Sequence, residues 1–405
     1  MNRLAVLLCM LAASVLARAG EIQFATPEVE CLWSGGNMDA PKLDILIMGD
    51  GYTLGEIPKF DKDAKALAAS IQKTEPYATY NNFYRIFLVR CVSKESGSRD
   101  EKDPPKDTCF GSYYGSALCP GNDKANVELA RQYAYRVRGL EVGSNIVIVL
   151  VNSDKYGGSA QDENRMLISS IPRADLTLIQ HEIGHVLGHL GDEYFTKDVA
   201  RKSDEILSPL NPNLITEVDD PKWQAWLGIE VEWYETDKVG VPARFSGPVD
   251  RYPGGWAKEL GVWRPTSNAC MMKRVEYPRY CPVCREGIIR GLYEHARIDP
   301  RWGCADAVGG GYSLWIETIF PEKSAHAAFL IGSDSIDPRF PDSTMTTTRG
   351  DATTMSFVLN LSRAEGSQPI LAIVWDDPPE IRTEFREIRY YYKVISFEAP
   401  ASIPK

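Results

Sequence analysis

Three of the five histidines in this 405-residue chain fall between His181 and His189, and two of them frame the pattern H-E-x-x-H. His181 and His185 are four residues apart, so on a helix their imidazoles would lie only about 40° apart around the axis. Two imidazoles that face the same way are typical zinc ligands. Glu182 would lie beside them, where its carboxylate can take a proton from a water that the metal activates. The spacing predicts a catalytic site with Zn²⁺ as cofactor and Glu182 as catalytic residue.

A catalytic zinc ion usually has three protein ligands, so the two histidines need a third partner. The candidates that follow the motif are His189, Asp192 and Glu193. Zinc enzymes with the pattern H-E-x-x-H-x-x-G-x-x-H have their third ligand where this chain has Gly191. Asp192 is favoured because it follows the expected end of the helix, where the chain is free to turn. Glu193 stays open as an alternative, whereas His189 would lie about 80° from the ligand face.

A helix must present these ligands, and the apolar spacing around them predicts one. The side of the helix opposite to His181 and His185 carries a row of apolar residues that would pack against a core. Gly188 and Gly191 predict where the helix ends and the chain turns back toward the metal. The apolar row consists of Leu176, Ile179, Ile183, Val186 and Leu190.

Strands that alternate with helices surround this segment. Apolar and β-branched runs predict strands over 43–48, 84–92, 145–151 and 165–170, and helical spacing predicts helices over 57–72 and 125–137. This alternation indicates an α/β (α+β) domain with a mixed sheet. The segment 165–170 is interpreted as an edge strand, along which an extended substrate would pair.

The character of the sequence changes after about residue 305. Stretches at 356–361, 370–374 and 390–395 alternate apolar and polar residues, with turn residues between them. They predict a small C-terminal region that resembles a β-sandwich. We therefore divide the chain into a catalytic domain over 20–304 and a β-rich accessory domain over 305–405.

The first 19 residues have the pattern of an export signal. One positive charge precedes an apolar run over 4–16, which is too short to span a bilayer comfortably, and residues 17–19 give an A-x-A cleavage pattern. No later apolar run is long enough for a membrane span. We expect a signal peptide over 1–19 and an exported protein, either periplasmic or extracellular.

Cysteine usage agrees with export. Eight cysteines remain once Cys9 is removed with the signal, and an even number in an exported chain favours disulfide bonds. The sequence does not give their pairing. An alternative for part of the set is a structural zinc site with four thiolates, because Cys281 and Cys284 form C-P-V-C. The other two thiolates of that site would come from Cys270 and Cys304.

Composition limits the partners. With 44% hydrophobic and 25% charged residues, the chain is typical of globular proteins. Its formal net charge is −10 and it has no long run of lysine and arginine, which argues against nucleic acid as the main partner. Nothing in the sequence indicates an oligomeric state.

A series of distinctive stretches covers about 43–291. They include I-L-I-M-G-D-G-Y-T at 45–53, V-N-S-D-K-Y-G-G at 151–158, H-E-I-G-H-V-L-G-H-L-G-D-E-Y at 181–194, W-R-P-T-S-N-A-C-M-M-K at 263–273 and C-P-V-C-R at 281–285. In this order and combination, they resemble the IgA-peptidase family of secreted bacterial zinc metallopeptidases. The resemblance implies a zincin-type domain in which His181 and His185 bind zinc, Glu182 is catalytic and a D-E-Y carboxylate is the third ligand.

Two further groups near the C-P-V-C segment bear on the site. In related zincins, a methionine in a tight turn lies beneath the metal, so the resemblance gives Met271 or Met272 this role. Tyr277 and Tyr280 follow closely and could donate a hydrogen bond to a developing oxyanion, although ordinary packing is the commoner role of a tyrosine.

These observations together predict a secreted zinc-dependent metalloendopeptidase that acts on a protein or peptide substrate. The alternative is an exported zincin-fold binding or adhesion protein with little or no peptidase activity. The intact H-E-x-x-H argues against this alternative, because an inactive protein would be free to lose Glu182. A metal-dependent hydrolase of other bonds is a third hypothesis, which the sequence separates poorly from the first.

Overall fold

The computed structural model describes most of the chain between residues 28 and 397. The described residues are 28–35, 42–115, 117–119, 128, 131–132, 134–135, 145–161, 165–170, 176–208, 210–236, 242–296, 300–306, 311–331, 355–361, 370–382 and 392–397. The signal peptide predicted over 1–19 and most of the helix predicted over 125–137 lie outside these ranges. Within them, no helix has the length and apolar character that crossing a membrane requires.

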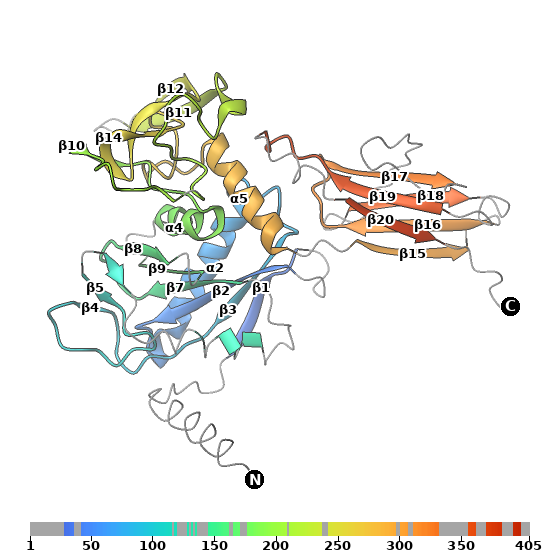
Figure 1. The fold of residues 1–405 in the computed structure, drawn as a ribbon. Helices are drawn as coiled ribbons and strands as arrows, with labels where there is room; N and C mark the ends of the chain where they lie inside the picture. The colour runs from blue at the N-terminus through green and yellow to red at the C-terminus, as the bar shows by residue number, and fades with distance from the viewer. Residues whose placement is uncertain are drawn as a thin grey trace, which may run out of the picture.

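A mixed sheet forms the centre of the N-terminal part of the chain (Figure 1). Its strands are β1 (Val29–Trp33), β2 (Leu43–Asp50), β3 (Tyr84–Val89), β7 (Asn145–Val151), β8 (Gly158–Gln161) and β9 (Met166–Ser170). They lie in the order β1-β3-β2-β7-β9-β8. The four central strands are parallel, whereas β1 and β8 run antiparallel to their neighbours at the two edges. The mixed α/β fold class is therefore confirmed at this level.

The position of β9 corrects one prediction. The segment 165–170 forms a strand as expected, but β9 pairs with β7 on one side and with β8 on the other. The edge strand is β8, whose four residues Gly-Ser-Ala-Gln carry a single small apolar side chain. Such a segment gives no apolar periodicity, so the sequence did not reveal it.

Apolar side chains on both faces of the sheet explain why its strands read as continuous hydrophobic runs. Ile45 and Ile47 belong to a core cluster that also contains the apolar face of helix α2 (Ile57–Lys73). Leu46 and Met48 belong to a second cluster on the opposite face. The buried residues of α2 are Phe60, Ala64, Leu67, Ala68 and Ile71.

A long segment between β3 and β7 covers the second face of the sheet. It contains three short strands, β4 (Arg99–Asp100), β5 (Tyr113–Tyr114) and β6 (Leu118–Cys119). The Asp50 carboxylate, at the end of β2, fixes this segment by accepting hydrogen bonds from the backbone N–H groups of Phe110 (2.8 Å) and Ser112 (3.0 Å). Asp50 is thus an anchor for the loop.

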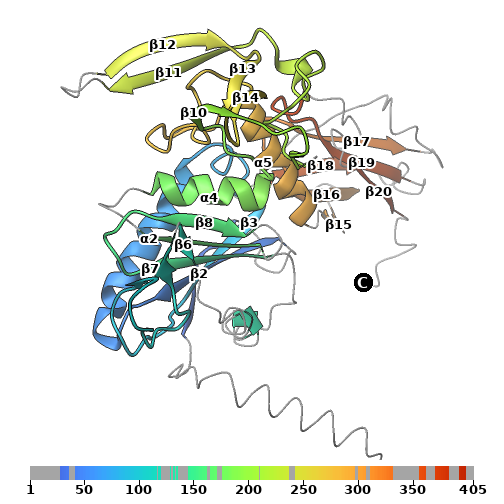
Figure 2. The same cartoon turned by 60° about the vertical axis from the view of Figure 1, so that its left-hand side comes forward.

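Two helices carry the H-E-x-x-H segment and the C-P-V-C segment. Helix α4 (Thr177–Gly188) lies along β8 and β9, and helix α5 (Pro282–His295) packs against α4 (Figure 2). Glycines permit the close approach of the two helices. A Cβ at Gly291 would lie 1.9 Å from the carbonyl oxygen of Leu187. A Cβ at Gly287 would lie 3.1 Å from that of Gly188.

The chain between α4 and α5 forms a separate layer of small sheets. β10 (Phe195–Ala200), β14 (Ala257–Arg264) and β13 (Tyr252–Gly255) form one sheet, and β11 (Glu230–Thr236) and β12 (Pro242–Pro248) form a hairpin. Short 3₁₀ helices occur at η1 (Leu54–Glu56) and η4 (Gln224–Trp226).

The C-terminal part contains two three-stranded antiparallel sheets. Their strands are β15 (Arg301–Asp306), β16 (Tyr312–Thr318), β17 (Ala325–Ile331), β18 (Met355–Leu361), β19 (Ile370–Asp376) and β20 (Tyr392–Phe397). The ring of Phe320, between β16 and β17, lies 6.5 Å from that of Tyr293 on α5. The β-sandwich arrangement and the division into 20–304 and 305–405 stay predictions, although β15 already begins at Arg301.

Candidate metal centre

Helix α4 places His181 and His185 on one side, one turn apart. Their Nε2 atoms are 3.2 Å from each other. The chain then turns and brings Asp192 back, so that its Oδ1 atom lies 3.1 Å from Nε2 of His181 and 3.2 Å from Nε2 of His185. The structure therefore brings together the three residues that the sequence singled out as metal ligands.

The other nitrogen of each imidazole is held by a backbone carbonyl. Nδ1 of His181 lies 3.1 Å from the oxygen of Met271, and Nδ1 of His185 lies 2.6 Å from the oxygen of Leu190. A carbonyl oxygen only accepts hydrogen bonds, so each Nδ1 carries the proton and donates it. In the neutral imidazole, this leaves the lone pair on Nε2, which points at the partner ligands.

The donor set fits a zinc ion. Nitrogen and oxygen ligands lie about 2.0–2.2 Å from tetrahedral zinc, and this geometry separates any two of them by roughly 3.3 Å. The three donor atoms here are 3.1–3.2 Å apart. The Asp192 carboxylate also favours positive charge at this point. Burial lowers the pKa of His185, but hydrogen bonding to Asp192 outweighs it and raises the pKa to about 9.

A tight turn after α4 makes the return of Asp192 possible. The helix ends at Gly188, as predicted, but the left-handed residue that caps it is His189, with φ of 50°. Gly191 then packs so closely that a Cβ would lie 2.3 Å from Leu214. Asn213 accepts a hydrogen bond from the Gly191 N–H and donates one to its oxygen, both at 2.8 Å. The ring of His189 is not part of the ligand group.

Glu182 is buried beside the two histidines and next to the edge strand. A Cβ at Gly158, the first residue of β8, would lie only 2.7 Å from Oε1 of Glu182. Burial raises the pKa of Glu182, and the nearby Asp192 adds to this, while the two histidines oppose it. Gly158, the last glycine of V-N-S-D-K-Y-G-G, thus lets strand β8 approach the carboxylate.

Glu193, the alternative third ligand, points away from the histidines. Its side chain is fully buried, and Oε1 lies 3.1 Å from the sulfur of Cys284 and 3.1 Å from Nδ2 of Asn213. The backbone N–H of Glu193 donates to the oxygen of Met272 at 2.9 Å. In the geometry of the structure, it is Asp192 that joins the histidines.

Met271 and Met272 both contact residues of helix α4. Met271 holds His181 through its backbone oxygen. Met272 packs against α4, where a Cβ at Gly184 would lie 3.0 Å from its sulfur. Both side chains are fully buried. This arrangement agrees with the supporting role that the resemblance implied for this segment.

The two tyrosines expected as candidate oxyanion donors are engaged elsewhere. The hydroxyl of Tyr280 donates to the oxygen of Gln180, and that of Tyr277 donates to the oxygen of Glu232 at 2.5 Å. Tyr194 lies at the site instead. Its ring is 6.5 Å from that of His181, and 47% of the residue is exposed. Burial, followed by the adjacent Asp192, raises the pKa of Tyr194, so its hydroxyl keeps the proton that a donor needs. The only signal in the sequence was its place in D-E-Y.

The cysteines depart from both predictions made for them. No disulfide bond joins the seven cysteines whose side chains the structure describes. The predicted set of four zinc thiolates is wrong, because Cys304 is exposed on β15 while Cys270, Cys281 and Cys284 are fully buried together. The fourth member of that buried group is Glu193.

Comparison with known families agrees with this geometry. Residues 32–240, just over half of the chain, match the family described as IgA Peptidase M64. The matched range contains the H-E-x-x-H helix and Asp192, while the methionine and cysteine segments lie beyond it. No curated protein is significantly similar to the chain. The family match shows that the chain belongs to the IgA Peptidase M64 family and is a metallopeptidase.

Proposed function

We propose that the protein is an exported, zinc-dependent metalloendopeptidase with His181, His185 and Asp192 as the zinc ligands. The observation that supports this most directly is the group of three donor atoms 3.1–3.2 Å apart, with a buried glutamate beside it. When bound, a zinc ion supplies Lewis acidity, which acidifies a water molecule and polarises a carbonyl group.

Glu182 acts as the general base and then as the general acid. Its carboxylate takes a proton from the attacking water and passes that proton to the nitrogen of the leaving amine. Because burial raises the pKa of Glu182, its carboxylate binds a proton more strongly than that of an ordinary glutamate does. The backbone of β8 at Gly158 lies against the carboxylate and restricts where it can point.

The substrate is a protein or peptide segment that adds to the open edge of β8. Among the described residues, β9 is the one strand that pairs with β8, and the residues of β8 are half-exposed, so its outer edge can pair with an extended chain. A peptide on this edge passes directly beside Glu182. Tyr194, whose ring is stacked on that of His181 at 6.5 Å, donates a hydrogen bond to the carbonyl oxygen as negative charge develops on it. The signal over 1–19 directs the protein out of the cytoplasm.

Glu182→Gln tests the function, because it keeps the shape of the side chain and removes the base. We expect both proteins to bind zinc at the site that contains His181. Only the native protein should cleave a mixed library of natural peptides, and mass spectrometry of the products would follow this cleavage. The variant should lose at least about 100-fold in kcat/KM, which is the range of general-base catalysis. Chelator should abolish cleavage by the native protein, and added zinc should restore it.

A matched pair of histidine variants is the control. His185→Ala should abolish cleavage and zinc binding at the site, whereas His189→Asn should leave both unchanged, because asparagine tolerates the left-handed backbone at this position. Zinc binding without any cleavage of the library would favour the binding or adhesion protein. Cleavage that survives Glu182→Gln would rule out the proposed base.

A further inference from the structure

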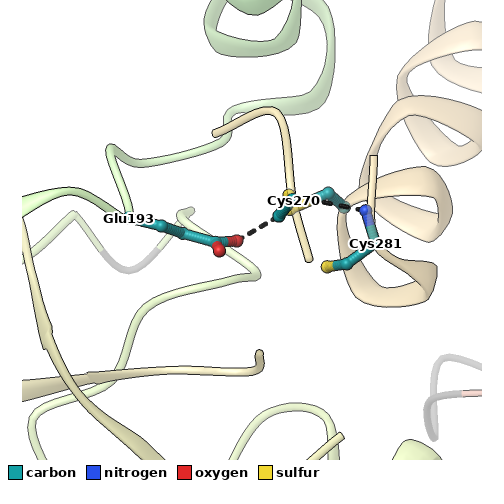
Figure 3. A group of neighbouring side chains, drawn as sticks. Glu193, Cys270 and Cys281 are labelled. Carbon is teal, nitrogen blue, oxygen red and sulfur yellow. Dashed lines mark hydrogen bonds between the residues drawn. The ribbon is translucent and has the colours of Figure 1, made fainter. Parts of the chain in front are cut away.

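Besides the group of His181, His185 and Asp192, a second group of side chains could bind a metal ion. Glu193, Cys270, Cys281 and Cys284 each offer a donor atom, and all four atoms lie within 4.8 Å of one another. All four residues are fully buried. Figure 3 shows the carboxylate of Glu193 pointing toward Cys270. Cys270 lies in the loop before α5, Cys281 is the N-cap of this helix and Cys284 lies in its first turn.

The distances within this group are short and one polar atom has no partner. The sulfurs of Cys270 and Cys284 are 3.6 Å apart, and the sulfur of Cys284 lies 3.1 Å from Oε1 of Glu193. Among the described residues, Oε2 of Glu193 has no hydrogen-bond partner. A buried carboxylate oxygen without a partner costs free energy. A bound cation or a proton at this oxygen would remove that cost.

We propose that these four residues form a second zinc site, with a structural role. Zinc is the metal that thiolate-rich, closed, four-ligand sites select. Sulfur ligands about 2.3 Å from tetrahedral zinc lie roughly 3.8 Å from each other, close to the observed separation of Cys270 and Cys284. Cys281 and Cys284 have the C-x-x-C spacing of zinc sites, at the beginning of α5. No position is left open for a substrate.

The charges around the group match a bound zinc ion. Three thiolates and a carboxylate exceed the charge of one zinc ion by two negative charges. Two cationic side chains, Arg264 and Lys273, interact electrostatically with Glu193. Arg264 is itself buried. The surroundings can therefore balance a fully deprotonated ligand set, which an apolar pocket could not do.

The second site would hold the first one in place. Glu193 directly follows Asp192, and Cys270 directly precedes Met271, whose oxygen orients His181. Cys281 and Cys284 tie both segments to α5, which packs on the ligand helix α4. Through these links, one ion would fix three segments that approach the catalytic centre from distant parts of the chain. The four residues are positioning groups and do not touch the substrate.

The decisive measurement uses the whole mature chain, in which substitutions have removed the first site. In His181→Ala/His185→Ala, shown to be folded by circular dichroism, we expect one tightly bound zinc per chain. X-ray absorption at the zinc edge should show sulfur neighbours at about 2.3 Å. The native protein should contain one zinc more and show a mixed shell of sulfur and lighter atoms. This readout does not depend on peptidase activity, so it stands even if the proposed function fails.

Cys284→Ser in the same background should remove the remaining zinc, and Cys304→Ser, the matched control on an exposed strand, should retain it. If Cys284→Ser does not fold, the X-ray absorption spectrum of the double-histidine variant still tests whether sulfur atoms bind the zinc. A folded double-histidine variant without zinc, or with zinc bound only by nitrogen and oxygen, would overturn the proposal. A disulfide between any two of the three cysteines, found by mass spectrometry of unreduced peptides, would also overturn it.

Discussion

At the candidate metal centre, each histidine is oriented through the ring nitrogen that faces away from the group of donor atoms. The two histidines donate Nδ1–H to carbonyl oxygens that lie beyond the helix, so their rings have one orientation. Glu182 is positioned differently, because the absence of a side chain at Gly158 creates the space it occupies. The geometry of the site thus depends on backbone atoms and on glycine as much as on the ligands.

Gly158→Ala should reduce activity without removing the metal. Gly158 lies in an ordinary strand, so alanine fits its backbone, but the new methyl group would lie 2.7 Å from Oε1 of Glu182. The carboxylate must shift, and a displacement of about 1 Å can cost roughly 100-fold in rate. Steady-state cleavage and zinc analysis check this. Gly55→Ala is the matched control, because its Cβ meets nothing within 4 Å. Unchanged kcat/KM in Gly158→Ala would contradict the assigned position of the base.

At the scale of elements, the two helices and the edge strand define the site. Helix α4 is buried on nearly all sides because β8 and β9 cover one side and α5 covers another. Small residues at the α4–α5 contact bring the C-P-V-C end of α5 close to the ligand helix. The packing of α5 is therefore part of what places the metal ligands.

Gly291→Ala should destabilise the fold. Its methyl group would lie 1.9 Å from the carbonyl oxygen of Leu187, so α5 must move away from α4. We expect a loss of about 1–3 kcal/mol in the free energy of unfolding, the usual range for overpacking. Intrinsic helix propensity would favour alanine by roughly 1 kcal/mol, so a net loss can only come from the contact. Urea unfolding measures it, with Glu294→Ala on the exposed side of the same helix as control. A stability equal to that of the native protein would show that α5 adapts freely.

The sequence predicted these elements unevenly, and for physical reasons. Strands with continuous apolar runs, such as β2 and β7, were placed to within two residues. Strand β8 was not predicted, because its polar segment is defined by pairing with β9 rather than by its own sequence pattern. Asp192 could be favoured from local chain geometry. The exclusion of Glu193 and Cys304 required tertiary contacts. Glu193 meets Cys284, which lies 91 residues further along the chain, whereas Cys304 stays outside this group although it is close to Cys284 in sequence.

At the scale of the whole molecule, a buried carboxyl group in the C-terminal sheets acts electrostatically on the N-terminal part of the chain. Asp376, at the end of β19, is buried, and neither of its carboxylate oxygens has a hydrogen-bond partner among the described residues. Burial, together with the neighbouring Asp377 and Glu380, raises its pKa from 3.8 to about 8. Its charge also acts on Tyr80 of the catalytic part.

This carboxyl should make the protein less stable as pH rises. Between its ordinary pKa of 3.8 and the folded pKa of about 8, Asp376 binds a proton in the native state and not in the unfolded state. The unfolded state then binds fewer protons, so the free energy of unfolding falls with rising pH in this window. Asp376→Asn should flatten that slope and increase stability most at the upper end of the window. Denaturant unfolding at several pH values checks this, with Asp219→Asn as control, because Asp219 is exposed and is not among the groups that act on Asp376. An unchanged slope in Asp376→Asn would assign the pH dependence to other groups.

The hydrogen bond between His181 and Met271 joins residues 90 positions apart. A chain that leaves the ribosome or crosses a membrane N-terminus first therefore exposes its H-E-x-x-H segment well before the carbonyl that orients the first histidine. A nascent chain that ends before residue 271 has both histidines and the glutamate but lacks the support beneath them. The order of the segments thus means that the complete hydrogen-bonded surroundings of His181 can form only after about two thirds of the polypeptide has emerged.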